Sequence, residues 1–306
     1  VAVLEMGLYT TGEIALLARL ARPSIGVVTA VRGVHLSRAG SIEAIESGMS
    51  ELVEALPTDG WAILNADDQR VRRMAAHTAA GVRTYGFSDD ADVRATNVVS
   101  LGTKGMRFTL HAEGGTYEVD TPVLGRHGVH NALAAVAVAE RAGMDIADII
   151  TGLARPLRMP HRSQLVTAGP WRVLDDSYNA SPDAVLAALD LLAELPGRHF
   201  AVLGEMLELG EDTASEHRRV GAYAATIVDR LVVVGEGARG IADGATDRGL
   251  DPERVHLAAD RDEALAVLLA QLQDGDSVLV KASRGAALDL LVERLVLAGG
   301  AGEVPA

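Results

Sequence analysis

Apolar residues in the first half of the chain follow two alternating patterns. Continuous apolar runs predict strands at 1–4, 24–29 and 61–64. Apolar residues at helical spacing predict helices at 12–21, 41–56, 67–77, 130–142 and 146–153. Buried strands separated by amphipathic helices are typical of a mostly parallel sheet. Between Val82 and Val123, short alternating runs and glycine turns instead predict an antiparallel excursion.

A second α/β pattern begins after Arg162. Its strands are predicted at 172–174, 199–203, 230–234, 254–257 and 277–280, with helices between them and a last helix at 286–297. Pro156 and Pro160 indicate a linker between the two patterns. We therefore predict an α/β fold with two domains, at 1–160 and 161–306.

Composition narrows the class of protein. Hydrophobic residues make up 48% of the 306 residues, which is enough for two cores. A net charge of -14 without a basic cluster argues against nucleic-acid binding, and the absence of cysteine excludes disulfides and thiolate chemistry. No apolar run reaches the ~20 residues of a membrane span, and no signal peptide is visible. We expect a soluble cytoplasmic protein whose sequence, starting at Val1 without Met, is truncated at its N-terminus.

The segment Asp175-Asp176-Ser177-Tyr178-Asn179-Ala180-Ser181-Pro182 carries the densest set of polar side chains. It lies between a predicted strand and a predicted helix, which is where α/β sheets bind ligands. Ser181 and Pro182 fit the N-cap and first position of that helix. A capped helix with a solvated acidic turn is the alternative. At the next such junction, Asp67 or Asp68 is expected to cap a helix.

Further candidates also follow predicted strands. Glu5 and His35 offer a carboxylate and an imidazole that together suit a divalent metal, although histidine is often structural. Arg162, at the predicted hinge, can reach phosphates or remain a surface residue. Gly125–Asn131 suits an anion or a base edge, or is simply a loop and cap. Gly204–Gly210 also lies on this predicted edge.

Lysine is rare: the chain has only Lys104 and Lys281. Lys104 fits a solvated turn. Lys281 opens the segment Lys281-Ala282-Ser283-Arg284-Gly285, directly after the last predicted strand. Cations and a hydroxyl beside a helix N-terminus suit a carboxylate or a phosphate, and a capped turn is the alternative.

Taken in order, these segments resemble the Mur ligases, the ATP-dependent amide ligases of peptidoglycan precursor synthesis. Asp175–Pro182 is similar to the family's Asp-Asp-Ser-Tyr-Asn-Ala-Asn-Pro motif, with Ser181 in place of the second Asn. Val202–Gly210, which reads VLGEMLELG, resembles the signature of one branch of the family. Lys281–Arg284 is similar to that branch's Lys-Gly-Ser-Arg, and Gly12-Glu13-Ile14 also fits. The resemblance covers essentially the whole chain.

The resemblance implies a partial Mur-ligase central ATPase domain at 1–160 and a C-terminal Rossmann-like α/β domain at 161–306. It implies that ATP phosphorylates the terminal carboxylate of UDP-N-acetylmuramoyl-tripeptide to an acyl phosphate. The amine of D-alanyl-D-alanine then attacks the acyl phosphate and an amide forms. ATP and Mg²⁺ are the implied cofactors, and a monomer without nucleic-acid or membrane partners is expected.

Residue roles carry over from the matching motifs. Glu5 and His35 are expected to bind Mg²⁺, and the nucleotide is expected to contact His127, Asn131, Arg162, Asp176, Tyr178 and Asn179. Within that set, Asn131 is assigned to the adenine, Arg162 to the phosphates and Asp176 to the ribose. The incoming dipeptide is expected near Lys281, Ser283 and Arg284. Arg162 and Lys281 are the expected catalytic residues.

Three departures from the family pattern keep other functions open. No segment fits the P-loop pattern G-x-x-x-x-G-K-[ST]. Met49 stands where the family has a carbamylated lysine, fourteen residues after His35, and methionine is a poor Mg²⁺ ligand. Gly128 replaces an asparagine near the adenine. On the main interpretation the chain is the catalytic body of such a ligase, cut short and inactive on its own. The alternatives are a non-catalytic remnant with weak nucleotide binding and another Mur-type ligase such as folylpolyglutamate synthase; Gly204–Gly210 argues against the last.

Overall fold

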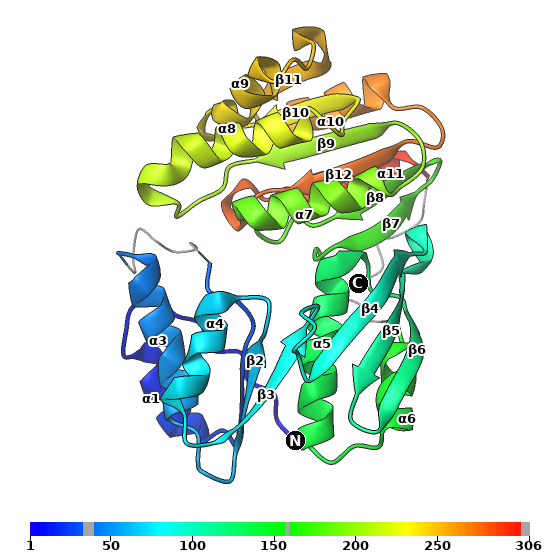
Figure 1. The fold of residues 1–306 in the computed structure, drawn as a ribbon. Coiled ribbons are helices and arrows are strands. Elements are labelled where there is room, and N and C mark those ends of the chain that lie inside the picture. The colour runs from blue at the N-terminus through cyan, green and yellow to red at the C-terminus, as the bar shows by residue number, and fades with distance from the viewer. Residues whose placement is uncertain (33–39, 157–158, 301–306) are drawn as a thin grey trace. The chain divides into compact units, whose positions relative to one another are not determined.

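The computed structural model describes residues 1–32, 40–156 and 159–300 (Figure 1). The chain divides into two compact units, Val1–Pro156 and Leu157–Ala306. Each unit has a six-stranded sheet of its own. This confirms the predicted α/β fold class.

The sheet of the first unit follows the order of the chain. Its strands are β1 (Ile25–Val28), β2 (Trp61–Asn65), β3 (Gly81–Gly86), β4 (Val93–Ser100), β5 (Met106–Ala112) and β6 (Gly115–Thr121). The pairs from β1 to β4 are parallel, whereas β4, β5 and β6 pair antiparallel. The parallel sheet with its antiparallel excursion is therefore confirmed.

Helices cover this sheet on both faces. They are α1 (Glu13–Ala21), α3 (Ile42–Glu54), α4 (Gln69–Arg73), α5 (Gly125–Arg141) and α6 (Ile146–Leu153). Because side chains alternate along a strand, Leu64 packs with Ile45 and Met74 on one face. Ile63 packs with Leu133 of α5 in a separate core on the other face.

Three predictions for this unit were wrong. Residues 1–4 form no strand: Val1 and Val3 are highly exposed, and no described strand pairs with them. The helix predicted at 67–77 is the short α4 followed by a 3₁₀ turn, Met74–His77. Helix α5 starts at Gly125 rather than near 130. Gly128 lies close to Val123 within these first turns, since a Cβ at Gly128 would lie 3.1 Å from the Val123 side chain.

The second unit has the strand order β11-β10-β9-β12-β8-β7. In chain order these strands are β7 (Gln164–Ala168), β8 (Trp171–Asp175), β9 (His199–Gly204), β10 (Arg230–Val234), β11 (Val255–Ala258) and β12 (Ser277–Lys281). All neighbours pair parallel except β7, which is antiparallel to β8. The connecting helices are α7 (Pro182–Ala193), α8 (Thr213–Ala224), α9 (Arg239–Asp247), α10 (Arg261–Gln271) and α11 (Asp289–Ala298).

These helices lie on both faces of the sheet. Helices α7, α8 and α9 pack side by side on one face, and α10 and α11 pack on the other (Figure 1). The adjacent strands β9 and β12 are followed by α8 and α11, which lie on opposite faces. In a doubly wound sheet, such a switch point opens a crevice at the carboxyl ends of the strands.

Strand β7 was not predicted, and the last helix starts at Asp289 rather than near 286. Strand β7 forms a hairpin with β8 through Gly169-Pro170. Gly169 has φ +60, and a Cβ there would lie 1.7 Å from the carbonyl oxygen of Gly299, so only glycine fits this turn. In the described parts of both units, no helix combines the length and apolarity needed to cross a membrane.

Candidate functional site

The carboxyl ends of β8 and β12 hold a buried ion pair. The side chain of Lys281 is only 3% exposed, and its Nζ lies 2.5 Å from Oδ2 of Asp176. The same ammonium donates a 2.9 Å hydrogen bond to the carbonyl oxygen of Asn179. A buried charge left without such a partner is costly. The pair joins the two segments that sequence had singled out separately.

Asp175 is the second carboxylate of the site and is fully buried. Its Oδ2 lies 2.8 Å from Nδ1 of His161. Its Oδ1 accepts hydrogen bonds from the backbone N–H and the hydroxyl of Ser177, at 3.1 and 2.6 Å. Sequence reasoning missed this role, although the Asp-Asp pair at a strand end was a signal for it. Asp175 therefore fixes the chain around His161.

Arg162 is held between two residues with left-handed backbone conformations, His161 (φ +61) and Ser163 (φ +48). The carbonyl oxygen of His161 accepts a hydrogen bond from the N–H of Tyr178 at 3.1 Å, and the N–H of Ser163 donates to Oδ1 of Asp176 at 2.9 Å. Left-handed conformations are uncommon outside glycine and persist where the surroundings fix them. These contacts fix the backbone on both sides of Arg162.

The aromatic ring of Tyr178 contacts two arginines. The guanidinium carbon of Arg162 lies 4.1 Å from the ring centroid, and that of Arg284 lies 5.4 Å from it. Both arginines and the tyrosine are exposed. Two cations gathered on one ring form a group suited to an anion such as a phosphate or a carboxylate.

Ser283, Asn179 and Ser181 complete the junction. The hydroxyl of the buried Ser283 accepts a hydrogen bond from the N–H of Leu207 at 3.0 Å and donates one to the carbonyl oxygen of Ala180 at 3.4 Å. Asn179 is exposed. Ser181 occupies the N-cap position before α7, but its side chain makes no capping hydrogen bond. The structure thus brings together the predicted residues Arg162, Asp176, Tyr178, Asn179, Lys281, Ser283 and Arg284 at one sheet edge.

In the first unit, a polar cluster lies where β2 and β3 end. The side-chain amide of Asn65 donates to the carbonyl oxygen of Thr29 at 2.6 Å, and its Oδ1 lies 3.1 Å from Nε2 of His130. The same imidazole nitrogen lies 3.3 Å from Oδ2 of Asp67. We did not predict this cluster, because the position of His130 on α5 relative to the strands is a tertiary property.

Burial and hydrogen bonding change the pKa values of His130 and Asp67 in this cluster. Burial lowers the pKa of His130 below its usual value, although the nearby Asp67 carboxylate partly opposes the shift. Burial alone would raise the pKa of Asp67, but hydrogen bonds from the Ser88 hydroxyl and the N–H groups of Phe87 and Ser88 lower it overall. His130 lies against the rings of Tyr85 and Phe87, with centroids 5.1 and 5.6 Å away. The cluster therefore favours a neutral imidazole beside a charged carboxylate.

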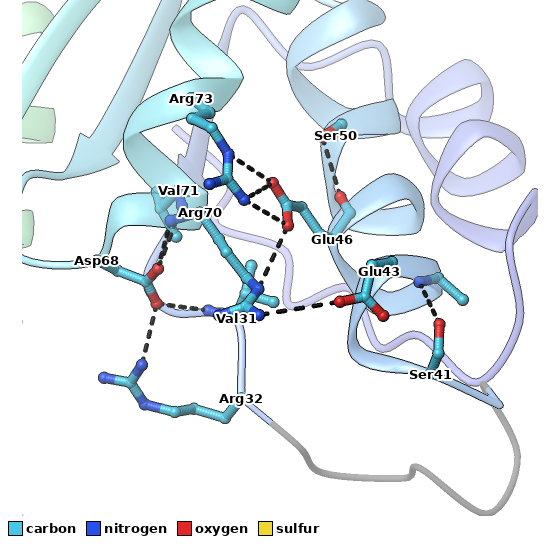
Figure 2. A network of polar contacts seen from close by, with 11 residues as sticks. Val31, Arg32, Ser41, Glu43, Glu46, Ser50, Asp68, Arg70, Val71 and Arg73 are labelled. Atoms are coloured by element: carbon cyan, nitrogen blue, oxygen red, sulfur yellow. Dashed lines mark hydrogen bonds and ion pairs between the residues drawn. The ribbon is translucent and has the colours of Figure 1, made fainter.

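Asp68 is a structural residue (Figure 2). It caps α4 by accepting hydrogen bonds from the N–H groups of Arg70 and Val71, which confirms the predicted cap. Its Oδ2 also accepts from the N–H of Val31 at 2.9 Å. Figure 2 shows Glu46 of α3 pointing toward Arg70 and Arg73, with Arg73 Nη2 at 2.8 Å. These contacts join α3 and α4.

The residues predicted to bind the metal and the adenine do not form a comparable cluster in the described part of the chain. Glu5 is exposed in an irregular segment, and His35 lies outside the described residues. Across residues 1–32, 40–156 and 159–300, no group of three or more His, Asp or Glu side chains is arranged to hold a metal ion. Asn131 is exposed on α5, and the half-buried His127 lies 3.0 Å from the Cβ position of Gly125. Their roles remain predictions.

Comparison with known protein families agrees with this architecture. Residues 1–139 match the Mur ligase middle domain, and residues 161–284 match the Mur ligase, glutamate ligase domain. The chain belongs to the Mur ligase family. The resemblance predicted from the motifs is thereby confirmed.

Several similar proteins among the Mur ligases carry the same name. The chain is 43% identical to the UDP-N-acetylmuramoyl-tripeptide–D-alanyl-D-alanine ligase of Mycobacterium tuberculosis, over 99% of the chain and 64% of that protein. It is 34% identical to the Escherichia coli ligase of the same name, over 96% of the chain and 65% of that protein. A crystal structure of MurF from Acinetobacter baumannii superposes with a TM-score of 0.87 at 28% identity, over 97% of the chain and 64% of that structure. The chain thus spans slightly less than two thirds of these relatives.

Proposed function

We propose that this Mur ligase chain forms part of an ATP-dependent ligase that joins D-alanyl-D-alanine to UDP-N-acetylmuramoyl-tripeptide. The 43% identity to the Mycobacterium tuberculosis ligase of that name, across 99% of the chain, carries the proposal. Residues 1–160 are assigned to the ATP-binding domain and 161–306 to the C-terminal ligase domain. The intact segments Asp175–Pro182, Gly204–Gly210 and Lys281–Arg284 support this assignment.

In this proposal Arg162 and Arg284 provide positive charge for the phosphoryl and carboxylate groups of the reactants. Their position on the ring of Tyr178 restricts both guanidinium groups before ligand binds. Charge accumulates on phosphoryl oxygens during such a transfer, so preorganised cations lower the barrier. Lys281 positions Asp176 for the ribose and holds the turn at Asn179. Asn131 and His127 are assigned to the nucleotide, and the dipeptide is placed near Ser283.

Mg²⁺ would neutralise phosphate charge in this reaction. Glu5 and His35 remain the proposed ligands on the family pattern alone. The position at which the family has a carbamylated lysine is apolar in this chain. It is Met49 of α3, which packs against the hydrophobic cluster that includes Val28 and Ile45. This packing favours the second candidate function, a non-catalytic family member with weak nucleotide binding.

One assay tests the ligase proposal. The natural protein that contains this chain is incubated with ATP, Mg²⁺, UDP-N-acetylmuramoyl-tripeptide and D-alanyl-D-alanine, and the amide product is measured by mass spectrometry together with released phosphate. We expect product with the wild type and with Lys104→Met, and little with Lys281→Met. Lys104 is an exposed turn residue and so provides a matched control. Absence of product from the wild type would favour the non-catalytic alternative.

The same assay addresses Met49. We expect Met49→Lys to raise ligase turnover if the parent protein has a weakened metal site. Met144→Lys, at a residue that is 50% exposed, is the control for adding a positive charge. Equal turnover in the wild type and in Met49→Lys would contradict a weakened metal site.

A further inference from the structure

Helix α8 carries a buried histidine that the proposed function does not use. His217 is 1% exposed and lies outside the segments that were predicted to carry chemistry. Its Nδ1 lies 2.7 Å from the carbonyl oxygen of Thr213, one turn earlier in the helix, and its Nε2 lies 3.0 Å from the backbone nitrogen of Met206. The ring therefore joins α8 to the irregular segment that follows β9.

These two contacts fix the position of the imidazole proton. A carbonyl oxygen only accepts hydrogen bonds, so Nδ1 must carry the proton and donate to Thr213. A backbone N–H only donates, so Nε2 must be unprotonated and accept from Met206. Within the described part of the chain, the structure gives this buried N–H no other acceptor. Loss of the imidazole would therefore leave the N–H of Met206 unpaired, which is costly in a buried position.

The neighbouring helix α9 packs directly against the part of α8 that carries His217 (Figure 1). A Cβ at Gly240 of α9 would lie 3.0 Å from the Cβ of His217. At Gly221 of α8, a Cβ would lie 1.9 Å from the carbonyl oxygen of Ile241. Backbones approach this closely only where a side chain is absent. The helix that presents the imidazole is therefore itself held in place.

Residues 205–209 form the segment that the imidazole contacts, and Ser283 holds this segment as well. The N–H of Ser283 donates to the carbonyl oxygen of Glu205 at 3.0 Å, and its hydroxyl accepts from the N–H of Leu207 at 3.0 Å. The same hydroxyl donates to the carbonyl oxygen of Ala180. Leu207 and Ser283 both line a cavity of about 570 Å³. Hydrogen bonds thus connect α8, through this segment, to the sheet edge where the predicted site residues meet.

We propose that His217 is a positioning residue, which fixes residues 205–209 against Ser283 through its unprotonated Nε2. It acts through this segment and not by direct contact with a ligand. Its effect on ligation rests on the proposed function, in which the dipeptide lies near Ser283. A histidine needed only for stability would instead leave the kinetic constants of the folded protein unchanged.

Amide hydrogen exchange and ¹⁵N NMR of the 306-residue chain test the contact itself. We expect the imidazole of His217 to carry its proton on Nδ1. In His217→Leu, exchange at Met206 and Leu207 should become about 10- to 100-fold faster relative to the core amides of β12, because one buried hydrogen bond is lost. His217→Gln, whose side-chain oxygen can replace Nε2 as the acceptor, should restore part of the protection. The control is Val220→Ala, which removes buried packing from α8 but no hydrogen bond to the segment.

Ligase kinetics of the natural protein test the positioning role. We expect His217→Leu to raise the KM for D-alanyl-D-alanine about 10-fold, with kcat and the KM for ATP within about two-fold of the wild type. The reason is that a displaced segment changes the surroundings of the dipeptide and not the groups that react. His217→Gln should bring this KM back toward the wild-type value, and Val220→Ala should leave all three constants unchanged.

The outcomes separate this role from the proposed function. Protonation at Nε2, or unchanged exchange at Met206 in His217→Leu, overturns the inference. Faster exchange with unchanged kinetic constants overturns the positioning role, because ligation would then not depend on the segment. If the wild type forms no product, the proposed function fails, and exchange at Met206 decides whether His217 fixes the segment. If His217→Leu does not fold, the position of the imidazole proton and the exchange of Met206 in His217→Gln decide instead.

Discussion

The two units place acidic side chains at the same structural position, the carboxyl ends of parallel strands, but stabilise them differently. In the first unit, Asp67 is held by N–H and hydroxyl donors and by His130, whose pKa burial lowers. In the second unit, Asp176 is held by the ammonium group of the buried Lys281. Removal of one partner from a buried hydrogen bond costs about 1–3 kcal/mol, whereas removal of one partner from a buried ion pair costs about 3–5 kcal/mol. We therefore expect the second unit to be the more sensitive to single substitutions.

The largest effect is expected for Lys281→Met. The substitution leaves Asp176 charged at a site where its side chain is 13% exposed, and the free energy of unfolding should fall by about 3–5 kcal/mol. Urea unfolding followed by circular dichroism measures the change. Lys104→Met should stay within ~0.5 kcal/mol of the wild type, and Lys281→Met combined with Asp176→Asn should recover part of the loss. If Lys281→Met were as stable as Lys104→Met, the second unit would not be the more sensitive to single substitutions.

Asp175→Ala is expected to have the next largest effect. It leaves the buried donors of Ser177 and the imidazole of His161 without their acceptor, and the free energy of unfolding should fall by about 2–3 kcal/mol. Amide hydrogen exchange should also become faster at residues 161–163, which this carboxylate helps to fix. The exposed Asp274→Ala is the control. Unchanged exchange at Arg162 would show that Asp175 does not position it.

Asp68→Ala tests the first unit, and we expect a smaller loss of about 1–2 kcal/mol in the free energy of unfolding. The aspartate caps α4 and accepts from the N–H of Val31, so its removal leaves these donors unpaired. Asp59→Ala, at an exposed position, provides the comparison in the same thermal unfolding experiment. A loss as large as that of Lys281→Met would contradict the proposed difference between the units.

The smallest effect concerns pH. Because burial lowers the pKa of His130 in the folded state, protonation favours the unfolded chain. The contribution of His130 to stability is therefore full above pH ~6.5 and is lost as the pH falls through its folded-state pKa. His130→Gln should flatten the rise of stability between about pH 5 and pH 7, whereas the exposed His77→Gln should not. Identical slopes in the two variants would contradict this role.

Most elements could be predicted from sequence because their apolar patterns are long enough to distinguish strands from helices. The wrong predictions concern elements whose formation or bounds depend on strand pairing or on close packing with other parts of the chain. The run at 1–4 is apolar but pairs with no described strand, and β7 forms because β8 lies beside it. The start of α5 carries two glycines, Gly125 and Gly128, that are typical of a loop, although both lie inside the helix.

The sequence by itself determined the α/β class, the family and the segments that carry the chemistry, because these depend on local patterns and on residue order. The tertiary structure decided which of these side chains meet. It paired Lys281 with Asp176, turned Asp175 toward His161, and placed the imidazole of His217 beside the N–H of Met206. These contacts join residues from separate parts of the chain, and no local pattern contains their distances. The role of each charged side chain therefore depends on whether the fold places a partner beside it.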